Sequence, residues 1–330
     1  MKRITALILS AVLFCLTFCG CSKNKTVRVA VVTDTVGVSF AYMVAQSEQN
    51  LKDKKYEGTN FKFTVVNTYE DAHELLLKKK VDIITTTTPE AAKLYNKNDG
   101  KYVLSAIVSY APLYILESSL ESKISSMKDL RAKIIYAKQK GSFTDTILQY
   151  VLKGNRLDPK INTTVEYFDS NSAINDAFYE KESSLCYVAE PAATAIKTKS
   201  DYTNIVIDIN EEWDKIYPST PICYIGLVSS EKFAKKNKAA INDLLDGYKW
   251  SYEQMSEGSI SELNKYCKEY GLSGGSGSVI TMSTNAKPTV LTGSKMQAKT
   301  SAFFDLIYKQ NKNIFGQILP DEEFYFDITE

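Results

Sequence analysis

The sequence is poor in the residues on which several kinds of chemistry depend. Its 330 residues include one histidine, His73, and only four of its 40 basic residues are arginines. A single imidazole cannot provide the paired histidines of a zinc site or of a His-x-x-x-His helix. The basic residues are balanced by 39 acidic ones, so an arginine-rich face for phosphate or nucleic acid is not indicated. We therefore expect no nucleic-acid partner and no metal site.

Cysteine is also scarce, with six residues in the whole chain. Beyond the N-terminal segment the cysteines are Cys186, Cys223 and Cys267, an odd number without a Cys-x-x-Cys pair. A disulfide framework is therefore not indicated. We expect these three side chains to be buried as small apolar groups.

Long hydrophobic runs are absent except at the N-terminus, where Ile4–Phe18 follows the cationic start Met1-Lys2-Arg3. The run is shorter than the roughly 20 residues that span a bilayer. A short cationic segment followed by such a run is typical of a signal peptide. We expect no membrane-spanning helix in the mature chain.

The end of this segment, Phe18-Cys-Gly-Cys-Ser22, resembles a bacterial lipobox, in which the cysteine after a small residue is acylated. Cys21 is the expected lipidation site, with residues 1–20 as a lipoprotein signal peptide and residues 21–26 as a lipid-anchored tether. The several acyl chains of such a modification give stable attachment to a membrane. The alternative is a plain secretory signal with incidental cysteines.

The rest of the chain has the composition of a globular protein, with 44% hydrophobic and 24% charged residues. Its length predicts two compact domains. The sequence alternates between β-branched runs and segments of helical spacing, which predicts an α/β fold. Strands are expected at residues 27–33, 81–84, 133–136 and 185–188, and the helices that follow them at residues 40–44, 91–95, 145–152 and 192–197.

The two parts of the sequence echo each other, which indicates two related α/β halves. Asp71-Ala72 and Asp176-Ala177 are each expected to start a helix, and each is followed after a similar spacing by a proline that opens another helix. The first of these prolines is Pro89, with Thr88 as the expected cap. Two proline-containing segments, residues 102–116 and 218–228, are expected to cross between the halves. Further helices are expected at residues 231–270 and 294–308.

The sequence matches one catalytic motif, but the context that this motif needs is missing. Gly271-Leu-Ser-Gly-Gly275 matches the Gly-x-Ser-x-Gly nucleophile elbow, but no histidine follows it and a helical segment, not a strand, precedes it. We interpret it as a surface loop. Neither a P-loop nor a Gly-x-Gly-x-x-Gly motif after a strand is found, so no cofactor is expected.

The four strand-to-helix junctions are the best candidate for a ligand site. In an open α/β sheet these loops lie at the carboxyl ends of the strands, where ligands bind, and they expose hydroxyl groups beside helix N-terminal amides. Two halves facing each other would form a cleft for a small polar, partly anionic or heteroaromatic molecule. The other reading is that the hydroxyl residues only cap helices. The expected ligand contacts are Thr33, Asp34, Thr35, Thr86, Thr87, Thr88, Tyr110, Ser142, Phe143, Thr144, Glu190 and Trp213.

Several segments of the mature chain resemble the solute-binding lipoproteins of bacterial ABC importers of the nitrate/sulfonate/taurine and thiamine-precursor type. The resemblance is carried by six segments spread over the chain. They are Val81-Asp-Ile-Ile84, Ala91–Gly100, Ile124–Tyr136, Glu190-Pro191, Glu211-Glu-Trp213 and Leu319–Phe326.

The resemblance implies an α/β fold of the two-lobed periplasmic-binding-protein type II, with a two-strand hinge. Lobe 1 is expected to comprise residues 27–110 plus 225–330, and lobe 2 residues 111–224. The implied function is lipid-anchored binding of a small-molecule solute on the extracytoplasmic face of a bacterial cell membrane, without catalysis. The implied partners are an ABC permease and ATPase complex, and the protein itself is expected to be a monomer.

Two alternatives remain open from the sequence. The first is an orphan sensor or interaction lipoprotein with the same fold, in which the outer surface binds a partner. The second is an enzyme, because a pyrimidine-precursor synthase shares this fold. The enzyme would need clustered histidine or cysteine residues near a reactive lysine, whereas this chain has one histidine and dispersed cysteines.

Overall fold

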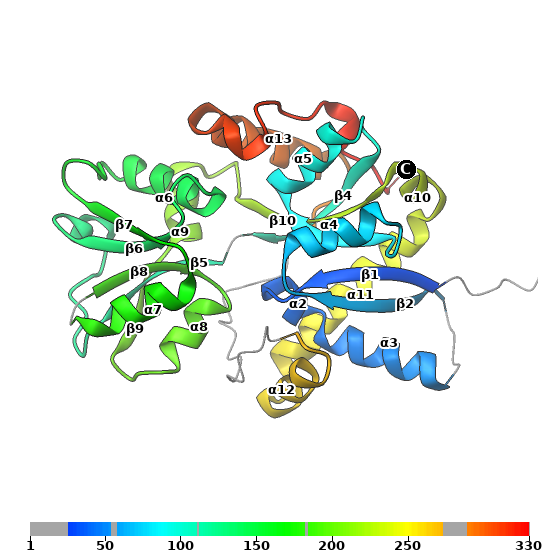
Figure 1. The fold of residues 1–330 in the computed structure, drawn as a ribbon, viewed down its shortest axis with the longest axis horizontal. Coiled ribbons are helices and arrows are strands. Elements are labelled where there is room, and N and C mark those ends of the chain that lie inside the picture. Colours follow the sequence, from blue (N-terminus) through cyan, green and yellow to red (C-terminus); the bar gives the residue numbers. More distant parts are fainter. Residues whose placement is uncertain (1–25, 54–57, 111, 182–183, 273–288, 330) are drawn as a thin grey trace, which may run out of the picture.

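The computed structural model describes residues 26–53, 58–110, 112–181, 184–272 and 289–329. The expected signal peptide, the lipidation site at Cys21 and all of the tether except Thr26 lie outside these residues, as does most of the glycine-rich loop that begins at Gly271. Among the described helices, none is long and apolar enough to cross a membrane. The described chain forms two α/β lobes that lie side by side (Figure 1).

The first lobe is built on a mixed five-stranded sheet with helices on both faces. The strands, in their order across the sheet, are β2 (Asn60–Val66), β1 (Thr26–Val32), β3 (Ile83–Thr87), β10 (Cys223–Ser230) and β4 (Tyr102–Tyr110). Its helices are α2 (Thr35–Ser39), α3 (Ala41–Asp53), α4 (Tyr69–Leu77), α5 (Thr88–Lys97), α10 (Glu231–Lys236), α11 (Lys238–Glu257), α12 (Ile260–Glu269) and α13 (Gly293–Gln310). Three short 3₁₀ helices are η1 (Met127–Leu130), η2 (Lys312–Phe315) and η3 (Glu322–Phe324), of which η1 belongs to the other lobe.

The second lobe repeats this plan with its own five-stranded sheet. The strands, in order, are β7 (Thr164–Phe168), β6 (Ile134–Lys138), β8 (Ser184–Ala189), β5 (Leu113–Ser118) and β9 (Thr203–Asp208). Its helices are α6 (Phe143–Gly154), α7 (Asn171–Glu180), α8 (Ala192–Lys197) and α9 (Ile209–Ile216). Helices α6 and α9 cover one face of the sheet, and α7 and α8 cover the other (Figure 1).

The two sheets have the same topology, which confirms the expected relation between the halves. In each lobe three parallel strands lie side by side, with the second in sequence at the edge, the first next to it and the third after that. An antiparallel strand and then a last strand complete the sheet. The antiparallel strand is β10 in lobe 1 and β5 in lobe 2. Each antiparallel strand lies beside one of the two segments by which the chain passes between the lobes.

The expected strands and helices are found, with local differences. The helical segment expected at residues 231–270 is divided into α10, α11 and α12. The threonines 85–87 continue β3 instead of forming a loop, because β-branched side chains suit a strand and β10 pairs with all three. Helix α5 is therefore capped at Thr87, whose side chain makes no capping hydrogen bond. Asp176 lies in the middle of α7, which begins at Asn171, and does not start that helix.

Buried hydroxyl groups of Thr85, Thr86 and Thr88 have hydrogen-bond partners within lobe 1. The Thr85 hydroxyl accepts the backbone N–H of Val32 at 3.3 Å, and the Thr88 hydroxyl donates to the carbonyl of Cys223 at 2.6 Å. The Thr86 hydroxyl lies 2.8 Å from Nε2 of His73. These bonds offset the cost of removing the hydroxyl groups from water.

A third connection joins the lobes where α13 packs on α6. The Tyr150 hydroxyl donates to the carbonyl of Leu306, and Asn311 Nδ2 donates to the Gly141 carbonyl at 3.0 Å. The ring of Trp213 in α9 packs against Phe303 in α13, with centroids 5.7 Å apart. The largest apolar core is therefore continuous from lobe 1 into the α6–α9 side of lobe 2.

Trp213 is the largest fully buried side chain in this shared core, and its Nε1–H donates to the Thr220 carbonyl at 2.6 Å. We predict that Trp213→Ala lowers the free energy of unfolding by about 3–5 kcal/mol, the usual cost of removing a buried large aromatic ring. Urea denaturation would measure the change. Trp250→Ala, at a partly exposed position, is the control and should cost much less. Equal losses for the two variants would contradict this account of the shared core.

Candidate functional site

The two lobes enclose a cavity of about 70 Å³ at the carboxyl ends of β1 and β8. It receives side chains from both lobes and from both crossing segments. The residues that line it are Asp34, Thr35, Val36, Tyr69, Ser109, Pro112, Ala189, Glu190, Tyr224 and Ile225. Three residues expected from the sequence, Asp34, Thr35 and Glu190, are therefore brought together here.

Asp34 is held at the end of β1 as the N-cap of α2. Its extended backbone lets Oδ1 accept the N–H groups of Val36 at 2.8 Å and Gly37 at 2.9 Å. Oδ2 accepts the Tyr69 hydroxyl at 2.7 Å. Only glycine fits at position 37, because a Cβ there would lie 2.0 Å from the Val32 carbonyl oxygen. The tight turn therefore fixes the carboxylate at the cavity wall.

Burial makes the charged form of this carboxyl group expensive. Desolvation raises the pKa of Asp34, and the hydrogen bonds from Tyr69, Gly37 and Val36 oppose this change by stabilising the carboxylate. Burial also raises the pKa of Tyr69, and the nearby Asp34 charge acts in the same direction. The Tyr69 hydroxyl therefore keeps its proton at neutral pH and donates a hydrogen bond to Asp34.

Glu190 faces Asp34 from the other lobe, at the end of β8. Its carboxylate accepts the N–H of Thr194 at 3.0 Å and the Thr194 hydroxyl at 2.9 Å, in the first turn of α8. The Glu190 backbone carbonyl accepts the Thr35 hydroxyl at 3.1 Å. This last bond joins the two lobes directly across the cavity.

An aromatic contact also spans the lobes beside the cavity. The ring of Phe143, the first residue of α6, stacks on Tyr224 of β10 with centroids 5.3 Å apart and planes 12° apart. Phe143 also makes an edge contact with Phe303. Phe143 therefore touches the cavity wall through Tyr224, although it is not itself a lining residue.

The other expected ligand contacts lie around the cavity or away from it. Thr86 and Thr88 are fully buried in hydrogen bonds within lobe 1, and Thr87 is nearly buried at the start of α5. Thr33 follows β1 and bonds to β2 through its backbone N–H. Trp213 is in the shared core.

Tyr110 ends β4, and burial raises its pKa to about 12. Ser142 caps α6 by accepting the N–H of Asp145 at 3.2 Å. The Thr144 hydroxyl lies 3.2 Å from the Ser142 hydroxyl, while its carbonyl accepts the Tyr187 hydroxyl. The role of these residues as ligand contacts stays a prediction.

Sequence reasoning missed Tyr69 and Tyr224, which line the cavity next to Asp34 and Glu190. Tyr69 is the first residue of α4, and Tyr224 is the second residue of β10. A signal was available for Tyr224, because it lies in the segment expected to cross between the lobes. Nothing local marks Tyr69, whose role comes from the pairing of β1 with β2.

The lining has a clear electrostatic character. It includes two carboxylates, those of Asp34 and Glu190, and among its residues in the described chain there is no lysine or arginine. The single histidine is not part of this lining, because His73 bonds to the Thr86 hydroxyl. Cys186, Cys223 and Cys267 are also outside it and are buried as free thiols, as expected. The cavity therefore favours hydrogen-bond donors and positive charge over anions.

A larger hollow of about 440 Å³ lies outside the cleft, along α6 and the end of α13. Its walls carry Lys140, Lys153 and Lys160 as well as Asp145. Its size is greater, but it is open to the side and is not formed at the facing strand ends of both lobes. We therefore take the smaller cavity between the lobes as the candidate site.

Comparison with protein families gives one match, to the model described as NMT1/THI5 like, over residues 55–258. This is more than half of the chain. A comparison with curated protein sequences finds no match.

Solved structures give further matches in fold. An ABC transporter from Parabacteroides distasonis is similar with a TM-score of 0.71 and 20% identity, covering 92% of this chain and 99% of that one. The periplasmic aliphatic sulphonate binding protein SsuA from Escherichia coli gives a TM-score of 0.66 and 16% identity, covering 92% of both chains. The alkanesulfonate-binding protein SsuA from Xanthomonas axonopodis pv. citri, bound to MOPS, gives 0.57 and 17%, covering 90% of this chain and 94% of that one. The two-lobed periplasmic-binding-protein fold is thereby confirmed.

The raised pKa of Asp34 predicts a pH dependence of stability. Because the folded-state pKa lies above the ordinary aspartate value of about 4, the stability that the bound proton contributes is complete below that value. It is lost as the pH rises through the raised pKa. The substitution Asp34→Asn removes this titration. We therefore predict that the free energy of unfolding falls less between pH 4 and pH 8 in the Asp34→Asn variant than in the wild type.

Urea denaturation at a series of pH values would measure both profiles. Tyr69→Phe serves as a second variant, because it removes a hydrogen bond that lowers the Asp34 pKa and should move the wild-type transition to higher pH. Identical pH profiles for the wild type and Asp34→Asn would contradict the assignment.

Proposed function

The chain belongs to the NMT1/THI5-like family, and from this membership we propose that it is a solute-binding protein that delivers a small molecule to an ABC importer. The observation that carries the proposal is the cavity lined from both lobes at facing strand ends. Solute binding by closure of two lobes around such a site is a common mode of hinge motion. The similar structures named above as ABC transporter and sulphonate-binding proteins support the same function.

Binding in this site requires the lobes to move. A volume of about 70 Å³ is well below the roughly 300–1,000 Å³ of sites for ring-sized ligands. The Thr35–Glu190 bond and the Phe143–Tyr224 stack both cross between the lobes. A ring-sized solute would enter after these contacts part, and the lobes would then close on it.

The lining supports a neutral or cationic solute that donates hydrogen bonds, such as a heteroaromatic amine. The Asp34 carboxylate lies in the cavity wall, and an anion there would meet two carboxylates without a cationic partner. Tyr224 and Tyr69 offer aromatic surface for a flat ring. The cavity therefore differs in charge preference from a site for a sulfonate, the kind of ligand named for two of the similar structures.

The cellular setting is part of the proposal. We propose that Cys21 carries a lipid anchor after removal of residues 1–20, so that the protein works as a monomer on the extracytoplasmic face of the membrane. Its lobes would comprise residues 27–110 plus 225–330 and residues 111–224, except that Cys223 and Tyr224 lie in β10 of the lobe 1 sheet. Its partners would be a permease and an ATPase. An orphan sensor of the same fold is the alternative, and an adjacent permease gene would favour import.

The ligand class can be tested with matched panels of small heteroaromatic amines and alkanesulfonates. We expect calorimetry to find binding among the amines, and small-angle scattering to find a change in the radius of gyration when the solute is bound, because the lobes must move to admit it. Asp34→Asn should weaken binding of a cationic solute by about 10- to 100-fold, because a hydrogen bond to a charged group contributes about 1.5–3 kcal/mol. A panel that gives neither binding heat nor a change in the radius of gyration would overturn the transport proposal.

Asp246→Asn is a matched control, because that side chain is 74% exposed and pairs with Lys249 far from the cavity. It removes the same charge and should leave the affinity unchanged. Preferential binding of a sulfonate would contradict the proposed ligand class while leaving the solute-binding function in place.

A further inference from the structure

A second hollow, of about 380 Å³, lies at the end of lobe 1 that faces away from lobe 2. It is formed where β1 begins, where β10 ends, and by the turn between α4 and β3 together with α10. We call it the basic groove. Its lining residues are Arg28, Leu76, Lys79, Val81, Asp82, Tyr102, Ser230, Lys232, Phe233, Lys236 and Asn237.

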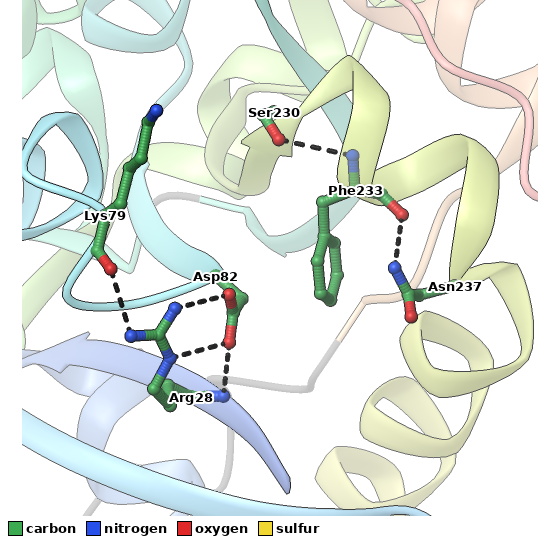
Figure 2. Close-up of polar contacts among 6 residues, drawn as sticks. All are labelled: Arg28, Lys79, Asp82, Ser230, Phe233 and Asn237. Atoms are coloured by element: carbon green, nitrogen blue, oxygen red, sulfur yellow. Dashed lines mark hydrogen bonds and ion pairs between the residues drawn. The ribbon is translucent and has the colours of Figure 1, made fainter. Parts of the chain in front are cut away.

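The floor of the basic groove is held rigid by an ion pair. Arg28 Nε donates to one carboxylate oxygen of Asp82 at 2.9 Å, and its Nη2 donates to the other at 2.7 Å (Figure 2). Nη1 of Arg28 donates to the Lys79 carbonyl at 2.9 Å, and the Arg28 backbone N–H also bonds to Asp82. The only acidic lining residue is therefore neutralised by Arg28, and the turn that carries Lys79 is fixed.

The opposite wall is the start of α10, which is also locked by hydrogen bonds. The Ser230 hydroxyl accepts the N–H of Phe233 at 3.2 Å, and Asn237 Nδ2 donates to the Phe233 carbonyl at 2.7 Å (Figure 2). This helix places Lys232 and Lys236 four residues apart, on one side of the helix. Both walls of the basic groove therefore present lysines from ordered segments.

These lysines give the basic groove an uncompensated positive charge. Lys79, Lys232 and Lys236 are exposed, and none forms an ion pair with another residue of the described chain. Figure 2 shows the Lys79 side chain pointing away from the Arg28–Asp82 pair. Because the charges of Arg28 and Asp82 cancel, the three lysines leave three positive charges along the lining.

The sequence places the proposed lipid anchor near this groove. Cys21 precedes Thr26, the first residue of β1, by five residues, and an extended chain of that length spans at most about 18 Å. Arg28 is only two residues further along the same strand. Anchoring through Cys21 would therefore hold the basic groove within reach of the membrane surface.

We propose that the basic groove binds the phosphate headgroups of anionic phospholipids in the membrane to which the chain is anchored. The proposal rests on the lipid anchoring included in the proposed function. Lysine ammonium groups act as compact point charges that suit headgroup phosphates, and lysines near an anionic surface add to membrane affinity. Contact at the basic groove would fix how lobe 1 stands on the membrane, with the solute cavity at the other end of β1.

The test uses the mature polypeptide with Cys21→Ser, so that no acyl chain contributes, and vesicles of phosphatidylglycerol and phosphatidylcholine at a ratio of 1 to 3, chosen as roughly physiological in charge. Cosedimentation should find binding at low salt that weakens as salt screens the charges. The triple variant Lys79→Gln, Lys232→Gln, Lys236→Gln should bind about 100-fold more weakly, since each such lysine contributes about fivefold.

The matched control removes three exposed lysines of lobe 2, by the substitutions Lys123→Gln, Lys128→Gln and Lys197→Gln. It has the same net charge as the groove variant and should bind vesicles within about twofold of the parent chain. Equal weakening in both triple variants would overturn the proposal, as would equal binding to vesicles of phosphatidylcholine alone.

A separate arm titrates glycerol phosphate into the parent chain and follows it by calorimetry. Tight binding of this soluble headgroup without vesicle binding would overturn the membrane as occupant of the basic groove. Solute binding in the cavity between the lobes should be the same in both triple variants. The failure of the groove proposal can thus be told apart from the failure of the solute-binding proposal.

Discussion

Strand β10 lies between β3 and β4 in lobe 1, although the whole of lobe 2 separates it from β4 in the sequence. In lobe 2, β5 occupies the equivalent position between β8 and β9. Each sheet contains a strand next to a crossing segment, but only the lobe 1 sheet is discontinuous in sequence: lobe 2 uses the consecutive strands β5 to β9, whereas lobe 1 receives β10 after the chain has passed through lobe 2 and returned. Because the chain passes from lobe 1 to lobe 2 and back, strand ends of the two lobes face each other, and the cavity lies between them. Tyr224 and Ile225 reach the cavity because β10 begins at the crossing.

The chemistry of the cavity depends on a compromise at Asp34. Three hydrogen bonds favour its ionised form, while burial raises its pKa. Such a group is a strong acceptor for a donor-bearing solute, because closure removes the competing water. The same burial makes the site unfavourable for an anion. If the chain binds a donor-bearing solute as proposed, it differs in ligand from the two similar structures named for sulfonates while sharing their fold.

The sequence was sufficient for most local elements and for the pairing of the two halves. Helix α8 begins and ends where its pattern predicted, and Asp34, Thr35 and Glu190 were identified from their places after strands. The threonine run 85–87 was misread because a polar residue can remain in a buried strand when its hydroxyl finds a partner, and that partner is known only in three dimensions. Tyr69 was missed for the same reason, since its contact with Asp34 depends on which strands are neighbours.

The packing of α13 on α6 has a mechanical consequence. Tyr150, Asn311 and Phe303 tie the lobes along one edge. On another side, Thr35 of α2 bonds to Glu190, which lies between β8 and α8 of lobe 2. The first edge shares a continuous apolar core, whereas the second is crossed by the bond from the Thr35 hydroxyl to the Glu190 carbonyl. If the lobes separate, we expect them to rotate about the contact between α13 and α6. The cleft would then open on the side of α2 and α8, and a solute would enter there.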